Sequence, residues 1–487
     1  MVYTAGIDLG TTGCKAVITD SCGKIAGQEY IEYPLIISGN KIEQDAELWW
    51  ELSCKAVEAA AAKSGAAKEE IKAIAVSSQG ISFVPVDAYL TPLCRAFSWL
   101  DTRAKKERDY ILSRFGEKEM FYMTGKRVSE GYSLPKIMWL KNNKKDIYKK
   151  THKILTAHDF LVAKMTGECI TDSTMAGGTM LFDVTKRRWS EKITDAFDIA
   201  VDLLPKIGQP GAPAGLLGGA AAQKMGLKKN ITVAVGGQDQ KVAAYFARRG
   251  GNAATLSLGT AGAMEFIVPA PVFDKKMRLP LFPFIQKDKW TLEPVISTAG
   301  AALKWYRDAF FEGESYQALD ARAGKSAPGS GGVFFYPHFG MASSPHWLPD
   351  KKGAFYGLTL GTSADEITRA VLEGIAFQIK ENLDICEALS EKITGMMVFG
   401  SGSRSDIWCK IIADITGKDI YALASPDAAA QGAAALALES LGDTGDTKDI
   451  NDIDDITEYT RYTPDGENQK IYKKIYKNYR ETEAKLL

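Results

Sequence analysis

The chain opens with short apolar or alternating runs that are separated by turn residues. The runs cover residues 3–8, 15–20 and 24–33, and Asp-Ser-Cys-Gly at 20–23 is a turn signal. Runs with β-branched residues between such turns are typical of antiparallel strands that follow one another along the chain. The pattern therefore predicts a three-strand meander at the start of the chain.

Helical patterns then alternate with further strand patterns. Apolar residues recur at helical spacing from 46 to 65, where Gly65 predicts the end of a helix, and residues 71–80 have the pattern of a buried strand. The alternation continues with predicted helices at 132–143 and 157–167, a predicted strand at 231–237 and a predicted helix at 239–250. Strands that alternate with helices predict an α/β fold.

The strand-and-turn pattern of the first residues starts again near residue 252, with "NAATLSLGTAGAMEFIV". A chain of 487 residues is long enough for two domains, so we expect one at 1–248 and one at 249–487. The second half also contains a predicted strand, Gly/Ser loop and helix at 395–417, a helix of small residues at 425–442, an acidic connection at 443–458 and a charged helix at 460–487.

Composition excludes several classes of protein. Lys+Arg and Asp+Glu are both 60, which argues against a dedicated nucleic-acid binder. No run of about 18 apolar residues predicts a membrane span, and the first residues lack the pattern of a signal peptide. The 7 cysteines are dispersed without a C-x-x-C pair, as in a protein with reduced thiols. We therefore expect a cytoplasmic protein without a membrane or nucleic-acid partner.

One turn sequence occurs twice, in "GIDLGTTGCKAVITD" (6–20) and in "LSLGTAGAMEFIV" (256–268). Glycines and threonine hydroxyls at the tip of a hairpin suit phosphate, although a single copy could be a plain hairpin. Asp8 precedes the first turn, where the second copy has Ser257. A carboxylate beside phosphates calls for a cation, so we expect Asp8 to anchor Mg²⁺. Neither turn matches a P-loop.

Two longer segments resemble the signatures of the FGGY carbohydrate kinases: "GYSLPKIMWLKNN" (131–143) and "GAFYGLTLGTSADEITRAVLEGIAF" (353–377). Acetate kinases and Hsp70-like ATPases share the turns but not these segments. The resemblance covers nearly the whole chain. It implies two actin-like ATPase (ribonuclease H-like) domains with a cleft between them, and a kinase that uses ATP and Mg²⁺. The domain at 1–248 would hold the sugar, the first phosphate turn and a catalytic aspartate, and the domain at 249–487 the second turn and the adenosine.

The catalytic aspartate is predicted in "VAVGGQDQKVAA" (233–244). Asp239 follows two glycines and a glutamine at the start of a predicted helix, where an aspartate is often only an N-cap. The resemblance implies that Asp239 is the general base for a sugar hydroxyl and that Gln240 contacts the sugar. An aspartate that accepts the hydroxyl proton is a recurring part of phosphoryl transfer.

The resemblance also implies the nucleotide contacts. Lys15, two residues past the first turn, could reach a phosphate or face solvent as an ordinary strand lysine. The expected contacts are Gly10, Thr11, Thr12, Gly13 and Lys15 at the first turn, Gly259 and Thr260 at the second, Gly300 and Lys304 on a following helix, and Gly400, Ser401, Gly402 and Ser405 at the adenosine.

The sugar contacts implied by the resemblance lie in "AVSSQGISFVPVD" (75–87) and "FSWLDTRA" (97–104): Gln79, Gly80, Ile81, Trp99, Asp101 and Arg103. Glycerol kinases carry Arg-Glu, and xylulokinases Met-His, after the glutamine; this chain has Gly80 and Ile81 instead. Trp99 could stack on a sugar or pack in the core, and Asp101 and Arg103 could bond hydroxyls or each other. His158, near the sugar side by analogy, is expected to be a buried structural residue.

These observations predict an ATP-dependent kinase that transfers the γ-phosphate to a hydroxyl of a small sugar, a pentulose such as xylulose. The alternatives are a kinase of a hexulose, a deoxysugar, gluconate or glycerol, and an ATP-binding sensor of the same fold without catalysis. The sequence leaves open the sugar and the oligomeric state, a homodimer included.

Overall fold

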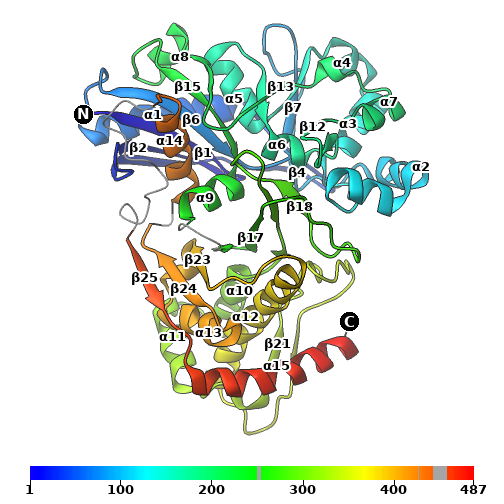
Figure 1. Ribbon diagram of the computed structural model, residues 1–487, viewed down its shortest axis with the longest axis vertical. Coiled ribbons are helices and arrows are strands. Elements are labelled where there is room, and N and C mark those ends of the chain that lie inside the picture. The colour runs from blue at the N-terminus through cyan, green and yellow to red at the C-terminus, as the bar shows by residue number, and fades with distance from the viewer. Residues whose placement is uncertain (249–253, 426, 443–457, 487) are drawn as a thin grey trace.

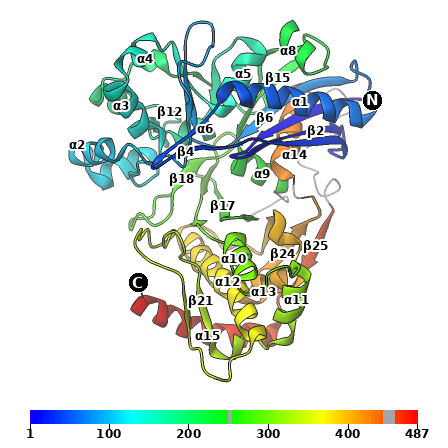
Figure 2. The same cartoon turned by 180° about the vertical axis from the view of Figure 1, so that it is seen from behind.

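The computed structural model describes residues 1–248, 254–425, 427–442 and 458–486. Two lobes lie one above the other, with the amino-terminal half in the upper lobe and most of the carboxy-terminal half in the lower one (Figures 1 and 2). Each lobe has its own sheet and its own hydrophobic core. The domain boundary expected between 248 and 249, and nearly all of the acidic connection at 443–458, lie outside the described residues.

The sheet of the first lobe begins with the predicted meander, which is confirmed. β1 pairs antiparallel with β2, and β2 with β3, while β6 and β15 run parallel to β1 beyond it. In spatial order the strands are β14 (Pro213–Leu216), β15 (Thr232–Gln238), β6 (Ile71–Ser78), β1 (Tyr3–Leu9), β2 (Gly13–Asp20) and β3 (Ile25–Glu32). The carboxyl ends of β1, β6 and β15 therefore meet at one edge of the sheet.

The second sheet repeats this connectivity. Its hairpin β16–β17 is antiparallel, and β23 and β24 run parallel beyond β16. In order the strands are β18 (Leu281–Pro283), β19 (Trp290–Leu292), β17 (Gly262–Val268), β16 (Ala254–Leu258), β23 (Gly395–Phe399), β24 (Asp419–Leu423) and β25 (Tyr459–Tyr462), and β20 (Val295–Ile296) pairs with β17. Asp8 and Ser257 are each the last residue but one of the corresponding strand, β1 or β16.

Smaller sheets complete both lobes. A five-stranded sheet in the first lobe contains β4 (Ile36–Ser38), β5 (Lys41–Gln44), β8 (Ala96–Phe97), β7 (Phe83–Val86) and β9 (Lys153–Thr156). Three strand pairs are β10 (Ile170–Asp172) with β13 (Lys206–Gly208), β11 (Phe182–Asp183) with β12 (Arg188–Trp189), and β21 (Phe334–Tyr336) with β22 (Ala354–Tyr356).

The helices cover the sheets. In the first lobe they are α1 (Ala46–Ser64), α2 (Lys105–Thr124), α3 (Ser133–Asn143), α4 (Lys145–Lys150), α5 (Ala157–Thr166), α6 (Ser173–Gly178), α7 (Glu191–Ala196), α8 (Gly219–Lys224) and α9 (Asp239–Ala247). The second half adds α10 (Gly300–Phe310), α11 (Tyr316–Lys325), α12 (Ala364–Leu389), α13 (Asp406–Thr416), α14 (Ala428–Glu439) and α15 (Gly466–Leu486). Among the described residues, no helix is both long and apolar enough to cross a membrane.

Local signals in the sequence set several of these helix ends. Asp45 caps α1 by accepting hydrogen bonds from the backbone N–H groups of Glu47 and Leu48. Gly65 ends the helix in the left-handed conformation, at φ 69°, as its position in the sequence predicts. The predicted charged helix at 460–487 is partly wrong, because β25 first pairs with the edge of the second sheet before α15 begins at Gly466.

Helix α14 belongs to the second half of the chain but packs on the sheet of the first lobe, beside α9 (Figure 1). The contact is close because both sides are small: a Cβ added at Gly6 would lie 2.0 Å from the carbonyl oxygen of Ala430. On the other side, a Cβ at Gly432 would lie 2.5 Å from the carbonyl oxygen of Val242 in α9. The alanine-rich sequence of α14 thus serves packing between backbones.

Candidate functional site

The first predicted phosphate turn connects β1 and β2. The N–H of Gly10 donates to the carbonyl of Gly13 at 2.9 Å, and the Gln44 side chain donates to the carbonyl of Thr11 at 2.7 Å. These bonds fix the backbone of the turn. A cavity of about 320 Å³ opens over it, lined by Asp8, Gly10, Thr11, Thr12, Gly13, Lys15, Tyr30, Asp427, Ala429 and Ala430.

Asp8 lines this cavity and is partly exposed. Its Oδ1 accepts one hydrogen bond, from the Ser77 hydroxyl at 3.1 Å, at the end of the neighbouring strand β6. Desolvation by the surrounding protein raises the pKa of Asp8 to about 6, against the opposing effects of the Ser77 bond and of Lys15. A carboxylate held in this way gains from a nearby cation.

Asp239 follows the last residue of β15 and is the first residue of α9. Its Oδ1 accepts hydrogen bonds from the side chain of Gln238 and from the N–H of Gln240, the latter at 2.7 Å. The capping residue is Gln238, whose side chain accepts from the N–H of Lys241, so the N-cap interpretation of Asp239 is wrong. The carboxylate of Asp239 therefore belongs to the first turn of α9 and is partly exposed.

The pKa of Asp239 is raised to about 7, mainly by desolvation and next by the negative charge of Asp8. The N–H of Gln240 and the charge of Lys241 act in the opposite direction. Two carboxylates that repel each other at the same sheet edge are common in catalytic sites, where one of them serves as a proton acceptor near neutral pH.

The ammonium group of Lys15 is neither fully exposed to solvent nor unpaired. It forms an ion pair with the carboxylate of Asp427, the residue before α14. It also lies 5.9 Å from the centre of the Tyr30 ring. Both partners line the same cavity, so Lys15 remains within reach of a ligand there.

The second turn, between β16 and β17, joins the start of α10. The N–H of Gly300 donates to the carbonyl of Gly259 at 2.8 Å, and the N–H groups of Ala299 and Ala301 donate to the carbonyl of Thr260. A Cβ at Gly300 would lie only 2.6 Å from the oxygen of Gly259. Glycine at position 300 therefore lets the helix approach the turn.

A larger cavity, of about 590 Å³, lies between this turn, α10, α11 and the start of α13. Six of the predicted nucleotide residues line it: Thr260, Gly300, Lys304, Ser401, Gly402 and Ser405. Gly400, at φ 93°, turns the chain just before it. The sequence interpretation missed three aromatic residues of its wall, Trp305, Tyr316 and Trp408, and also Asp320, which accepts a hydrogen bond from the Ser405 hydroxyl at 2.8 Å.

The loop after β6 lies beside Asp239 and the first turn. The N–H of Gln79 donates to the carbonyl of Leu9 at 2.8 Å, and a Cβ at Gly80 would lie 3.1 Å from the side chain of Gln238. Ile81 follows in the left-handed conformation, at φ 57°. Gln79 and Gly80 therefore lie next to the residues that follow Asp8 and precede Asp239.

Trp99 is exposed at 42% and donates its indole N–H to the Thr11 hydroxyl at 2.9 Å, so core packing does not explain it. Asp101 and Arg103 instead bond each other. Arg103 donates from Nε to both carboxylate oxygens of Asp101 at 2.9 Å, and also pairs with Glu43 at 2.7 Å. Asp101 is fully buried, so this pair holds the loop rather than facing a ligand.

His158 is buried, as expected, and supports β15, the strand that leads to Asp239. Its Nε2 accepts a hydrogen bond from the N–H of Gly236 at 3.1 Å, and its Nδ1 lies 3.0 Å from Asp159. A bulge interrupts the pairing of β15 with β6 between Ala234 and Gly237. His158 thus fixes the backbone two residues before Gln238, a role for which the sequence contains no local signal.

Comparison with known proteins agrees with this geometry. The model of the FGGY family of carbohydrate kinases, N-terminal domain, matches residues 3–245, and that of the C-terminal domain matches residues 254–441. The chain belongs to the FGGY family of carbohydrate kinases. This confirms the predicted family, the two-domain actin-like ATPase fold and the class of reaction, the transfer of phosphate from ATP to a sugar hydroxyl.

The relatives of this FGGY kinase are named for different substrates, xylulose and gluconate. Xylulose kinase of Escherichia coli (strain K12) is 30% identical over 89% of each chain. The ligand-bound xylulose kinase of Lactobacillus acidophilus has a TM-score of 0.93 at 25% identity, with 100% of this chain and 98% of that one covered. Gluconate kinase from the same organism has a TM-score of 0.92 at 25% identity, over 99% of this chain and 98% of that one.

Proposed function

We propose that this FGGY kinase phosphorylates xylulose, with Asp239 as the general base. The observation that carries the proposal is the partly exposed carboxylate of Asp239, whose pKa lies near 7 at the edge shared with the first phosphate turn. A general base works best with a pKa close to the operating pH. Gln240 adds a buried Oε1 without a hydrogen-bond donor among the described residues, which a sugar hydroxyl could supply.

Asp8 fits the role of Mg²⁺ anchor. Mg²⁺ is usually held by one or two carboxylates together with phosphate oxygens and water, and Asp8 is a partly exposed carboxylate with a single hydrogen bond, beside the phosphate turn. When bound, the ion would neutralise charge on the phosphates. Ser77 would hold Oδ1 of Asp8 during this contact, and the ion would relieve the repulsion between Asp8 and Asp239.

The nucleotide would lie with its base in the larger cavity, beside Trp305 and Trp408, and its phosphates would lie toward the two turns. Asp239 would accept the proton of the sugar hydroxyl, whose oxygen attacks the γ-phosphate in line. Lys15 would exchange Asp427 for a phosphate oxygen. Since the turns line two separate cavities, closure of the lobes would complete the site and exclude water.

The sugar side favours a neutral sugar over gluconate. Arg103 is the cation among the predicted sugar contacts, and its guanidinium is already paired with Asp101 and Glu43. A carboxylate substrate bound there would lack a free positive partner. The exposed ring of Trp99 suits the apolar face of a ketose. The amide of Gln79 is buried and bonds to Gln44 and Ser82, so it supports the loop from behind.

The test is an assay of a panel of candidate substrates with ATP and Mg²⁺, in which phosphorylation is measured as the release of ADP. D-Xylulose should give the highest kcat/KM among pentuloses, hexuloses, deoxysugars, glycerol and gluconate. A higher value for gluconate would refute the neutral-sugar argument but leave the kinase activity intact. Failure of every sugar to stimulate ADP release, with ATP still bound, would favour the sensor without catalysis.

A further inference from the structure

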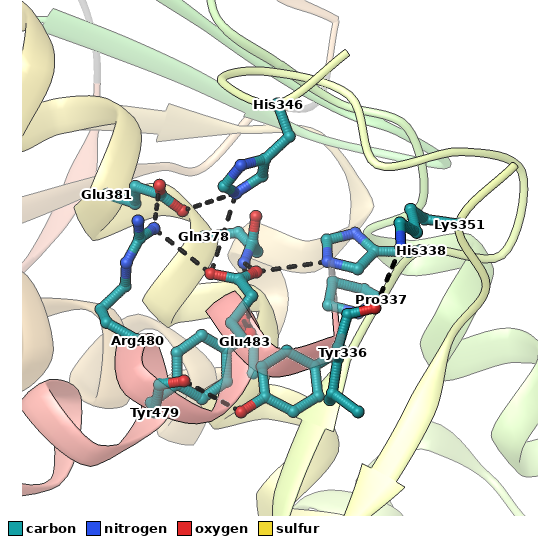
Figure 3. A network of polar contacts seen from close by, with 12 residues as sticks. Tyr336, Pro337, His338, His346, Lys351, Gln378, Glu381, Tyr479, Arg480 and Glu483 are labelled. Carbon is teal, nitrogen blue, oxygen red and sulfur yellow. Dashed lines mark hydrogen bonds and ion pairs between the residues drawn. The ribbon is translucent and has the colours of Figure 1, made fainter. Parts of the chain in front are cut away.

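A second cluster of titratable side chains lies in the lower lobe, where α15 packs against α12 (Figures 1 and 3). His346 comes from the segment between β21 and β22, Glu381 from α12 and Glu483 from α15. One potential ligand atom from each lies within 4.8 Å of the others. The side chain of Glu483 is 1% exposed, that of Glu381 6% and that of His346 17%.

The separations of these atoms suit one metal ion. Nε2 of His346 lies 3.3 Å from Oε2 of Glu381 and 3.8 Å from Oε2 of Glu483. A tetrahedral ion with bonds of about 2.0–2.2 Å holds its nitrogen and oxygen ligands about 3.3–3.6 Å apart. Small side-chain movements would therefore bring all three atoms onto one ion.

Neighbouring groups orient Glu483 as a ligand. Its Oε1 accepts a hydrogen bond from Nε2 of Gln378 at 2.5 Å and lies 3.2 Å from Nε2 of His338 (Figure 3). Its Oε2 is buried and receives no hydrogen bond, although it lies on the side of His346 and Arg480. Metal-binding carboxylates commonly have their second oxygen held in this way.

The charges of the cluster are incompletely balanced. Arg480 pairs with Glu381 and lies 3.2 Å from Oε2 of Glu483, so one guanidinium faces two buried carboxylates. A divalent cation would balance both carboxylates, and Arg480, whose side chain is 35% exposed, has room to turn toward solvent.

We propose that His346, Glu381 and Glu483 bind a divalent transition-metal ion such as Zn²⁺, and that Arg480 supplies the positive charge when no metal is bound. One nitrogen and two carboxylate ligands suit Zn²⁺, whereas Mg²⁺ prefers oxygen ligands alone. The ion would tie α15 to α12 and to the loop that carries His346. The matched C-terminal family domain ends at residue 441, so Glu483 lies beyond it.

The experiment uses the full chain, treated with a chelator, desalted and titrated with Zn²⁺ in the presence of excess Mg²⁺. Calorimetry should give one Zn²⁺ per chain, and the melting temperature should rise with Zn²⁺ because the ion binds the folded state. Co²⁺ should give the visible absorption of a low-symmetry site with a histidine ligand. His346→Ala should weaken Zn²⁺ binding by about 100-fold or more, and the exposed His152→Ala should not.

Arg480→Leu tests whether the arginine and the metal ion compete for the same two carboxylates, because it removes the competing positive charge. The variant should bind Zn²⁺ at least about tenfold more tightly than the wild type. Wild-type protein that binds no Zn²⁺, or His346→Ala that binds it as well as the wild type, would overturn the proposal. Kinase activity with ATP and Mg²⁺, unchanged in these variants, would show that each is folded.

Discussion

Asp8 and Asp239 stand at the same edge of the first sheet, and the charge of Asp8 raises the pKa of Asp239. They come from β1 and from the residue after β15, with β6 between them. The predicted phosphate turn adjoins Asp8, and Gly80 of the predicted sugar loop lies against Gln238, the residue before Asp239. Under the proposed function, the pair would lie between the nucleotide phosphates and the sugar.

The general base should reveal itself in the pH profile. Because Asp239 must be ionised to accept a proton, kcat/KM should rise with pH and level off above a pKa near 7. Asp239→Asn should lower kcat by several orders of magnitude while ATP binding, measured by calorimetry, survives. Near-normal turnover in this variant would contradict the assignment.

Removal of the Asp8 charge should act at a distance on Asp239. In Asp8→Asn the repulsion is gone, so the rise of the residual kcat/KM should move to lower pH. The Mg²⁺ concentration for half-maximal activity should increase if Asp8 anchors the ion. Asp146→Asn, on the exposed face of α4, is the control and should change neither quantity. An unchanged Mg²⁺ requirement in Asp8→Asn would refute the anchor role.

Asp239 should also make the free enzyme less stable as pH rises. Its pKa is raised from 3.8 to about 7 in the folded state, so between these values the folded state binds more protons than the unfolded state. The free energy of unfolding should therefore fall from pH 4 to pH 7. Asp239→Asn should be more stable than the wild type at pH 8, by about 1–2 kcal/mol because the group is partly exposed, and similar at pH 4. Urea unfolding at pH 4 and pH 8 measures the difference in unfolding free energy between the wild type and the variant. The same difference at both pH values would contradict the prediction.

Lys241 should link α9, the helix that begins at Asp239, to the second domain. Its fully buried ammonium lies 3.2 Å from Glu265 in β17 and 2.8 Å from Glu293. Lys241→Met should cost about 3–5 kcal/mol of unfolding free energy, because two buried carboxylates lose their partner. It should also move the rise of kcat/KM to higher pH, since Lys241 lowers the pKa of Asp239. If Lys241 had a purely structural role, the pH at which kcat/KM rises would not change. Lys224→Met, at an exposed position, serves as the control.

The contact between α10 and the second turn should control the affinity for ATP. In Gly300→Ala the new Cβ would lie 2.6 Å from the oxygen of Gly259, so either the turn or the helix must move. We expect KM for ATP to rise about tenfold or more, with a smaller effect on KM for the sugar. Gly219→Ala, where the added Cβ meets nothing within 4 Å, should leave both unchanged. Equal changes in both KM values would argue for a general loss of structure.

Much of the site was predictable because its signals are local. A turn suited to phosphate has glycines and threonines in consecutive positions, so the turns at Gly10, Thr11 and Gly259 could be located without a structure. The helix start at Asp239 and the helix end at Gly65 follow from residues within one turn of each position.

Contacts between distant segments could not be predicted in this way. The partner of Lys15 is Asp427, which is 412 positions away, and the partners of Arg103 include Glu43 in strand β5. The cap at Gln238 was missed because glutamine is a weak capping residue by type. No pattern in the sequence indicates that α14 crosses back to the first sheet.

The sequence by itself determined the alternation of strands and helices, the two glycine-rich turns and the family, because these depend on neighbouring residues and on long motifs. The tertiary structure alone decided the chemistry of the individual groups. Burial and charge from separate segments raise the pKa of Asp239, occupy Arg103 with Asp101 and Glu43, and collect His346, Glu381 and Glu483 at one point. Electrostatic energies depend on distances in space, and a sequence does not contain those distances.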